Sequence, residues 1–399
     1  MKVVHVVWGL TFGGIETMLV NIANAQARAG AEVRVMIVND YWDEPIVSSF
    51  DRRVKLLYVH KRKGSGNPFF IVRMNRMLLR EKPDVVHLHA KGFVTLLAGK
   101  GLKRIACQTL HDMPSGALRR EGMIYRLLPM LDITQPGNVT CIDKVRQVFA
   151  ISRAVHDALW EKYGVASRVV CNGIPAAEFR LRGERGAGAP LRVVQVSRLD
   201  HLKKGQDLLV EAAARLRGRV AVDFVGAGAS LELLKRMAAE RGLGQLVRFL
   251  GKKTQEEVKA MLADYDLFVQ PSRFEGFGLT VAEGMAAGVP VLVSAGEGPA
   301  EVTCGDLYGW TFENGNAERL AASMAYVLSH YGEALEKAKA ARRHVRETYD
   351  VSVTANKYLE EYKRFIMADS EKSLIGGGRK RGIALSLACE AVSGERRAA

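Results

Sequence analysis

Cysteine is scarce in this sequence, and the cysteines present are not spaced for a shared chemical role. There are five in 399 residues, and no two form a Cys-x-x-Cys motif. An odd number of scattered cysteines argues against a disulfide framework and against a cysteine-based zinc site. The pattern fits a reducing compartment, so we expect a cytoplasmic protein. The cysteines are Cys107, Cys141, Cys171, Cys304 and Cys389.

Long hydrophobic runs are also absent. No apolar run reaches the roughly 18 residues that a transmembrane helix needs. The apolar residues 1–7 give way to a polar, glycine-rich stretch at Gly9 without a small-residue cleavage site, so they predict a buried strand and not a signal peptide. With 48% hydrophobic and 25% charged residues, the composition is that of a soluble globular protein and excludes collagen-like, disordered and coiled-coil chains.

Positive charge is abundant and unevenly distributed. The chain carries 58 Lys and Arg residues against 43 Asp and Glu, which gives a net charge of +15. Residues 1–190 hold 28 basic and 16 acidic residues, whereas residues 191–399 hold 30 and 27. A basic N-terminal half attracts nucleic acid, anionic membranes or phosphorylated ligands, but the same composition also suits an ordinary solvated surface.

Short β-rich runs alternate with amphipathic helices along most of the chain. This alternation predicts α/β domains in which helices cover parallel sheets. A glycine-rich stretch without periodicity, residues 182–190, divides the series and is the best linker candidate. We therefore expect two doubly wound domains with a cleft between them, where ligands bind outside the carboxyl ends of the strands. The expected strands are residues 2–8, 32–38, 84–89, 104–109, 148–151 and 168–171 in the first domain, and 191–196, 220–225, 247–250, 267–270 and 289–293 in the second.

The domain boundaries follow from this series. The first domain is expected over residues 1–182 and the second over residues 191–348. A final helix is expected over about residues 351–367. Beyond it the chain holds a Gly-Gly-Gly-Arg-Lys-Arg segment and many small residues, so residues 368–399 are expected to form a disordered tail.

Two segments at predicted strand ends carry residues suited to a phosphorylated ligand. Gly13 and Gly14 precede a helix, where backbone N–H groups and the helix N-terminus attract anions, although a tight turn also explains them. Arg198 and the pair Lys203 and Lys204 follow the first strand of the second domain. Arginine grips two oxygens and lysine acts as a point charge, a combination that suits a diphosphate as well as a solvated loop.

The most informative segment is residues 271–290, Pro-Ser-Arg-Phe-Glu-Gly-Phe-Gly-Leu-Thr-Val-Ala-Glu-Gly-Met-Ala-Ala-Gly-Val-Pro. Gly276 and Gly278 expose backbone N–H groups beside a predicted helix start, which predicts an anion site. Glu275 lies in the loop, and Glu283 lies eight residues later within the helix. A carboxylate in the position of Glu283 can accept two ribose hydroxyl groups, as acidic residues do in nucleotide-binding α/β folds.

Residues 275–290 resemble the signature of the retaining glycosyltransferases of family 4, which have the GT-B fold of two facing Rossmann-like domains. Residues 13–16 are similar to that family's N-terminal glycine loop, residues 172–174 to its Asn-Gly motif, and residues 225–228 to its Val-Gly-x-Gly turn. Residues 349–362 resemble the helix that crosses back onto the first domain. The resemblance covers the chain up to about residue 368.

The resemblance implies a role for each domain and motif. The first domain would bind the acceptor, and the second would bind a nucleoside-diphosphate sugar. The glycine loop of Gly13 and Gly14 would lie beside this donor. The implied roles are diphosphate binding for Arg198, Lys204 and the backbone N–H groups of Phe277, Gly278 and Leu279, ribose binding for Glu283, and donor-sugar contacts for Glu275 and His111.

Two departures from the family pattern bear on the donor. One more residue than usual separates Arg198 from the Lys-Gly pair, so Lys203 would share or take the role of Lys204. The loop of residues 296–301 departs from the family pattern, so the donor sugar cannot be inferred from it.

The expected activity is transfer of a sugar to an acceptor hydroxyl group with retention at the anomeric carbon, and UDP is the favoured nucleotide. For the family the leaving phosphate is proposed to take the acceptor proton, so no protein base is assigned. The resemblance implies a glycan or lipid-linked acceptor in bacterial capsule, lipopolysaccharide or exopolysaccharide synthesis, with no cofactor and no nucleic acid. A sugar-nucleotide epimerase of the same fold and a basic nucleic-acid-binding protein remain alternatives, although no aromatic-basic stacking platform supports the second.

Two further segments bear on membranes and metals. Arg73, Arg76 and Arg80 share one face of a helix predicted near residues 68–80, beside an apolar face that suits either the inner surface of an anionic membrane or the domain core. Residues 264–266 form an Asp-x-Asp motif, which binds the donor's metal in the other major glycosyltransferase fold. Because the motif leads directly into a strand, Asp266 is expected at the strand's amino end, away from the cleft, and no metal is expected.

Overall fold

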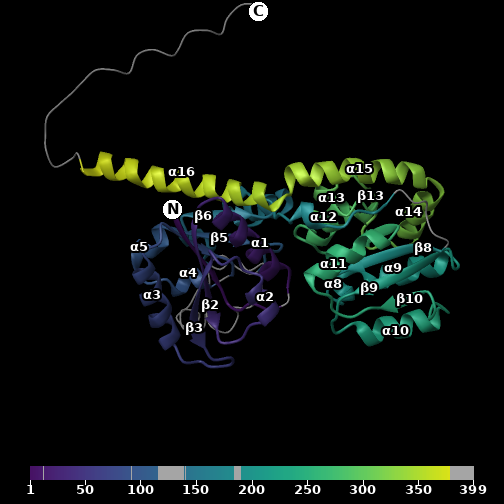
Figure 1. Ribbon diagram of the computed structural model, residues 1–399, viewed down its shortest axis with the longest axis horizontal. Coiled ribbons are helices and arrows are strands. Elements are labelled where there is room, and N and C mark those ends of the chain that lie inside the picture. Colours follow the sequence, from purple (N-terminus) through teal and green to yellow (C-terminus); the bar gives the residue numbers. More distant parts are fainter. Residues whose placement is uncertain (12, 91, 116–138, 140, 184–189, 378–399) are drawn as a thin grey trace, which may run out of the picture.

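Two parallel sheets, each buried between helices, form the two domains (Figure 1). The computed structural model describes residues 1–399 apart from 12, 91, 116–138, 140, 184–189 and 378–399. The N-terminal sheet has the order β3-β2-β1-β4-β5-β6-β7, and the C-terminal sheet has the order β10-β9-β8-β11-β12-β13. The predicted α/β class and the two doubly wound domains are confirmed.

The strands follow the predicted series closely. In the N-terminal sheet they are β1 (Lys2–Val7), β2 (Glu32–Asn39), β3 (Lys55–Lys61), β4 (Val85–Leu88), β5 (Ala106–Leu110), β6 (Gln147–Ala150) and β7 (Arg168–Val169). In the C-terminal sheet they are β8 (Leu191–Val196), β9 (Val220–Val225), β10 (Val247–Phe249), β11 (Leu267–Gln270), β12 (Val291–Ser294) and β13 (Trp310–Phe312). Two of these strands, β3 and β13, were not predicted, and each lies at an edge of its sheet.

The helices connect the strands and cover both sheets. In the N-terminal domain they are α1 (Gly14–Arg28), α2 (Glu44–Ser48), α3 (Phe69–Glu81), α4 (Phe93–Leu96), α5 (Gly99–Arg104) and α7 (Arg153–Tyr163). In the C-terminal domain they are α8 (His201–Lys204), α9 (Gln206–Arg215), α10 (Leu231–Glu240), α11 (Gln255–Met261), α12 (Leu279–Ala286), α13 (Gly298–Val302), α14 (Ala317–Ser329) and α15 (Tyr331–Thr348). The last helix is α16 (Val351–Gly377).

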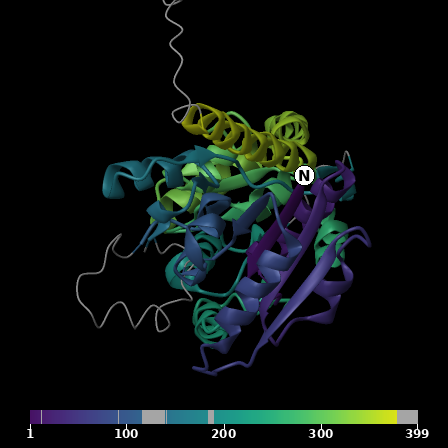
Figure 2. The ribbon, with the colours of Figure 1, turned by 90° about the vertical axis from the view of Figure 1, so that its left-hand side faces the viewer.

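Helix α16 leaves the C-terminal domain and packs on the N-terminal domain, along α1 (Figures 1 and 2). Tyr358 and Tyr362 are fully buried there and contact the ring of Phe149 on β6. The expected end of this helix near residue 367 is wrong, because the helix continues to Gly377. Residues 368–377 are therefore helical and not a disordered tail, and residues 378–399 lie outside the described part of the chain.

The two domains meet along the face that carries the carboxyl ends of the strands. A Cβ added to Gly276 would lie 3.3 Å from the Cα of Asp112, and one added to Gly14 would lie 3.7 Å from the Leu279 side chain. Glu301 of α13 accepts the backbone N–H groups of Arg153 and Ala154 at the start of α7. These contacts bring the loop after β11 against the N-terminal domain.

Candidate functional site

The site lies where the loops after β8, β11 and β12 meet. These strands are neighbours in the C-terminal sheet, and all run parallel, so their carboxyl ends share one edge. Gly205, after β8, has a positive φ of 65°. A Cβ there would lie 1.9 Å from the backbone oxygen of Pro271, so only glycine lets the two loops touch. This contact brings the basic loop after β8 beside the loop that carries Glu275.

Lys204 is the cation that reaches the loop after β11. Its Nζ donates to Glu275 Oε2 at 2.5 Å, and each of the two side chains is only 19% exposed. Lys203 is exposed, and within the described part of the chain its side chain forms no ion pair. The geometry therefore brings together Lys204 and Glu275, while Lys203 points to the surface.

Arg198 is exposed at the start of the loop after β8 and forms no ion pair with the residues that the structure describes. Across the cleft, Glu16 lies in the first turn of α1, directly after Gly13 and Gly14. Burial raises the pKa of Glu16, while its own backbone N–H and the charge of Arg198 oppose that shift. The glycine loop of the N-terminal domain thus lies near a guanidinium group of the C-terminal domain.

Glu275 is held by several hydrogen bonds. Its carboxylate accepts from the Ser272 hydroxyl at 3.0 Å as well as from Lys204. Its backbone N–H donates to Glu297 Oε2 at 2.8 Å. Burial raises the pKa of Glu297, and the nearby charges of Glu275 and Asp112 add to this effect. Glu297 was not predicted as a site residue, and its only signal in the sequence was the irregular loop at residues 296–301.

The start of α12 is built by glycines. Gly278 has a φ of 97° and precedes the helix, so glycine is required for the turn that exposes the helix N-terminus. Phe277 is buried, and Leu279 begins the helix facing Gly14. A Cβ on Gly298 would lie 2.5 Å from the backbone nitrogen of Phe277, so the loops after β11 and β12 pack directly on each other. The N-terminus of α12 therefore points its free N–H groups at the meeting point of the domains.

Glu283 lies within α12, whereas Glu275 lies in the loop before this helix, and Glu283 is 6% exposed. It accepts a hydrogen bond from Gln255 Nε2 at 2.8 Å. Burial raises the pKa of Glu283 to about 7, and the Gln255 hydrogen bond only partly opposes this. A carboxyl group that is half protonated near neutral pH suits a hydrogen-bonding role better than a solvated helix surface.

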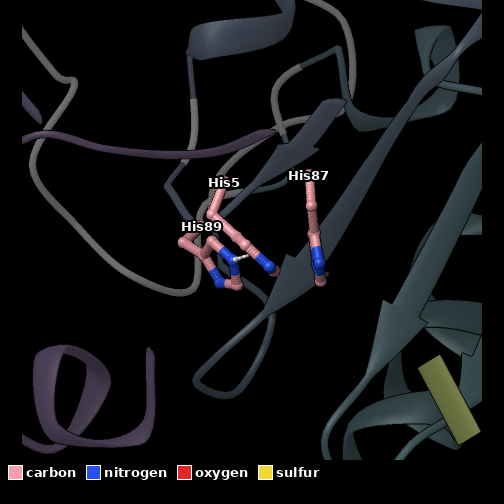
Figure 3. Close-up of side chains that lie close together, drawn as sticks. All are labelled: His5, His87 and His89. Carbon is pink, nitrogen blue, oxygen red and sulfur yellow. Dashed lines mark hydrogen bonds between the residues drawn. The ribbon is translucent and has the colours of Figure 1, made fainter. Parts of the chain in front are cut away.

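His111 follows the carboxyl end of β5, next to Asp112. Its Nε2 lies 3.1 Å from His89 Nδ1, and burial lowers the pKa of His111 to about 3. His5, His87 and His89 form a buried cluster behind it (Figure 3). Ligand atoms of these three rings lie within 4.8 Å of one another, as in a metal site.

The histidine cluster nevertheless fits a hydrogen-bond network better than a metal centre. His5 bonds to His89 and to Gln26, and His89 also bonds to His111. His87 bonds to the hydroxyl groups of Tyr362 and Thr109. Every ring nitrogen of the three histidines already has a protein partner, so a metal ion would have to displace these bonds.

The Asp-x-Asp motif lies apart from this site. Asp264 pairs with Arg180 at 2.6 Å, and Asp266 pairs with Arg182 at 3.1 Å. Asp266 also accepts the backbone N–H of Arg192 at the amino end of β8. The motif therefore ties the segment before the linker to the amino ends of the strands, opposite the cleft.

Comparisons with known proteins agree with this geometry. The model of "Glycosyltransferase Family 4" matches residues 12–178, and that of "Glycosyl transferases group 1" matches residues 181–346. The lipopolysaccharide core biosynthesis glycosyltransferase LpsE of Rhizobium meliloti is 28% identical over 333 residues, which are 82% of this chain and 89% of LpsE. A GDP-mannose-dependent alpha-(1-6)-phosphatidylinositol monomannoside mannosyltransferase of Mycobacterium tuberculosis is 34% identical over 181 residues, 43% of this chain and 47% of its own.

A solved structure shows the same fold. HepE of Anabaena, in complex with UDP and glucose, superimposes with a TM-score of 0.72 at 20% identity, over 91% of this chain and 100% of the HepE chain. The two family models together span both domains and include every residue of the cleft described above. The chain therefore belongs to glycosyltransferase family 4, the glycosyl transferases group 1, and is a glycosyltransferase with the GT-B fold.

Proposed function

We propose that this enzyme transfers a sugar from a nucleoside-diphosphate sugar to an acceptor hydroxyl group, with retention at the anomeric carbon. The observation that carries the proposal is the meeting of Lys204 and Glu275 beside the N-terminus of α12. A lysine and a helix N-terminus suit a diphosphate, and a carboxylate fixed by Lys204 and Ser272 suits sugar hydroxyl groups. The similarity to LpsE supports a role in bacterial lipopolysaccharide, capsule or exopolysaccharide synthesis.

The proposed chemistry depends on stabilising the leaving diphosphate. Arg198, Lys204 and the first N–H groups of α12 would neutralise the charge that develops on it. The close approach of Gly276 to Asp112 would exclude water and hold donor and acceptor together. The leaving phosphate would take the acceptor proton on the same face, so no protein base is required.

UDP is the proposed nucleotide, because HepE is described in complex with UDP, although the mannosyltransferase is named for GDP-mannose. A thermal-shift screen with UDP-, GDP- and ADP-sugars tests this choice. A ligand at 100 times its Kd stabilises the folded state by about 2.7 kcal/mol, so the correct donor raises the melting temperature. Stabilisation by GDP-sugars alone would overturn the choice of UDP. Conversion of the donor sugar to its epimer without acceptor would instead favour an epimerase.

Glu283 is proposed to bind the ribose hydroxyl groups. Replacing Glu283 with alanine should weaken binding of the nucleotide sugar by about 1–3 kcal/mol, the free energy of hydrogen bonds to a charged group. Replacing Glu275 with alanine should reduce turnover more than nucleotide binding, because Glu275 contacts the sugar. Isothermal titration calorimetry and steady-state kinetics measure the two effects. Unchanged affinity in Glu283→Ala would remove the ribose assignment.

The same assignment predicts a pH dependence. The pKa of Glu283 is about 7, and the ionised carboxylate is the better acceptor for two hydroxyl groups. Affinity for the nucleotide sugar should therefore fall as the pH decreases from 8 to 6, by up to about tenfold per pH unit below 7. In Glu283→Gln the affinity should be independent of pH across this range. Calorimetry at several pH values compares the two proteins, and identical pH profiles would contradict the prediction.

The exposed face of α3 is proposed to bind an anionic membrane surface, where a lipid-linked acceptor would lie. Phe70, Met74 and Leu78 face the domain core, as in an ordinary domain helix. The opposite face still exposes three apolar residues between three arginines, and none of the described helices is long and apolar enough to span a membrane. Apolar side chains among cations suit the headgroup region of anionic lipid. The exposed residues are Phe69, Val72, Arg73, Arg76, Leu79 and Arg80.

Co-sedimentation with vesicles tests the membrane proposal. The protein should bind vesicles rich in anionic lipid and not neutral vesicles, because each basic residue near such a surface contributes about 1 kcal/mol. Changing Arg73, Arg76 and Arg80 to glutamine should abolish this binding. A matched control changes three exposed arginines of the C-terminal domain, Arg215, Arg217 and Arg219, and should retain it. Equal and negligible binding to both kinds of vesicle would exclude the proposal.

Catalysis is proposed to need no divalent metal. Arg198, Lys204 and the N-terminus of α12 would neutralise the charge of the diphosphate. Asp264 already forms an ion pair with Arg180. Activity should therefore persist in excess EDTA, and Asp264→Asn should change it little. Initial rates with and without EDTA provide the measurement. Activity that EDTA removes and Mg²⁺ or Mn²⁺ restores would mean that the diphosphate site is misassigned.

A further inference from the structure

A row of buried hydrogen bonds connects helix α1 with His111. Gln26 Oε1 lies 2.8 Å from His5 Nε2, His5 Nδ1 lies 2.8 Å from His89 Nε2, and His89 Nδ1 lies 3.1 Å from His111 Nε2. Gln26 and His5 are fully buried, and His89 is 3% exposed. Figure 3 shows the bond between His5 of β1 and His89, which directly follows the neighbouring strand β4. The row therefore links the interior of the N-terminal domain to the edge of the cleft.

The first member of the row sets the direction of all its bonds. The carbonyl oxygen of Gln26 only accepts, so His5 must carry its proton on Nε2. A neutral ring has one N–H, so His5 Nδ1 is bare and accepts from His89 Nε2. His89 Nδ1 is then bare in turn and accepts from His111 Nε2. The remaining ring nitrogen, His111 Nδ1, has no hydrogen-bond partner among the described residues and is left as an acceptor.

Each ring of the row carries a single proton, because burial disfavours its charged form. Burial lowers the pKa of His5 to about 4 and that of His111 to about 3, and it lowers the pKa of His89 well below its usual value. The titratable groups packed around the row are other histidines and tyrosines, namely His87, Tyr358 and Tyr362. No carboxylate of the described residues bonds to the row. The three rings are therefore neutral at pH 7.

We propose that Gln26, His5 and His89 are positioning residues that fix His111 as the Nε2–H tautomer, with Nδ1 bare and available to a hydroxyl group of the substrate. The role of His111 toward a sugar rests on the transferase activity proposed above, but the tautomer does not. A neutral histidine held in this way accepts a hydroxyl hydrogen bond and adds no positive charge beside the donor sugar. The row thus selects one of the two neutral forms of a ring at the cleft.

The tautomer can be read directly from the free protein at pH 7. In long-range ¹⁵N–¹H spectra, bare and protonated ring nitrogens resonate in separate ranges, and the His111 signals are those lost in His111→Gln. The expected result is a single species with a protonated Nε2 and a bare Nδ1. A protonated Nδ1, or averaged shifts from two tautomers, would overturn the proposal. This measurement needs no substrate, so it distinguishes failure of the proposal from failure of the proposed activity.

Variants test whether the row is the cause. Gln26→Met removes the first acceptor and should convert His111 to a mixture of tautomers, whereas His89→Gln keeps a carbonyl acceptor for His111 and should preserve the single form. Tyr358→Phe is the matched control, because it removes a buried hydrogen bond to Thr109 and none of the row. An unchanged His111 spectrum in Gln26→Met, or a changed one in Tyr358→Phe, would contradict the proposal.

Kinetics adds a second readout. In Gln26→Met, kcat should fall about tenfold, which corresponds to one hydrogen bond in the transition state. The KM for the donor should stay unchanged, because the proposed diphosphate and ribose contacts belong to the other domain. A rise in KM at constant kcat would instead indicate a structural disturbance of the cleft and would overturn the positioning role.

Discussion

Replacing Lys204 with alanine is expected to lower kcat/KM for sugar transfer by about 100- to 1,000-fold. The substitution removes a cation from the proposed diphosphate site. It also leaves the Glu275 carboxylate without its ion-pair partner, which adds an uncompensated negative charge beside an anionic donor. Initial rates measured over a range of donor concentrations give this value. The effect should be the largest of any single substitution in the loop after β8.

Lys203 offers a control of the same charge at the next position. Its side chain is exposed and has no ion-pair partner in the described chain, so Lys203→Ala should change kcat/KM by no more than about twofold, as for a surface substitution. The comparison also decides which of the two lysines binds the diphosphate, a question that the spacing of the family motif left open. If Lys203→Ala were the more damaging variant, the assignment of the diphosphate cation would have to be exchanged.

Mild acid is expected to unfold the N-terminal domain. Four histidines have a lowered pKa because desolvation disfavours their charged form, namely the buried His5, His87 and His89 and the partly buried His111. Below pH 6.5 these histidines become protonated in the unfolded chain but stay neutral in the folded chain. Each histidine then lowers the free energy of unfolding by about 1.4 kcal/mol per pH unit, until the pH falls below its folded pKa. For His5 this range ends at about pH 4, and for His111 at about pH 3.

Denaturant titrations between pH 7.5 and 5 measure this dependence. Four such groups together remove a typical stability of roughly 5–15 kcal/mol within about two pH units. In His5→Gln the slope of unfolding free energy against pH should decrease by about 1.4 kcal/mol per unit. The exposed His330 provides a control, and His330→Gln should leave the slope unchanged. A slope that is the same in all three proteins would show that the buried cluster does not titrate on unfolding.

Much of the cleft could be predicted from the sequence because its residues are close together along the chain. Gly276, Gly278 and Glu283 lie within one loop and one helix, so glycine spacing and helical position alone locate them. The basic loop with Arg198 and Lys204 follows a strand whose hydrophobic run is unmistakable. Buried parallel strands form such continuous apolar runs, and the edge to which they bring their loops follows from their direction.

Other features depend on contacts between distant residues. His5 and His89 are 84 residues apart, and only the pairing of β1 with β4 brings their rings together. The strand β3 alternates exposed and buried residues at a sheet edge, and β13 has three residues, so neither has the long apolar run of a central strand. Glu297 lies in the site because Gly298 allows the loops after β11 and β12 to touch. No local sequence pattern predicts this contact.

The crossing of α16 onto the first domain has a consequence for synthesis of the chain on the ribosome. Strands β1 to β7 emerge first, but the groove between α1 and Phe149 is filled later, by residues of α16 that include Tyr358 and Tyr362. At about 5–20 residues per second, the ribosome needs roughly 10 to 40 seconds to add the residues between the first domain and these tyrosines. During that time the groove is an open apolar surface on a nascent polypeptide, accessible to chaperones and proteases. A premature stop before Val351 would leave it open permanently, so nonsense mutations late in the gene should destabilise the N-terminal domain although they leave all of its strands in place.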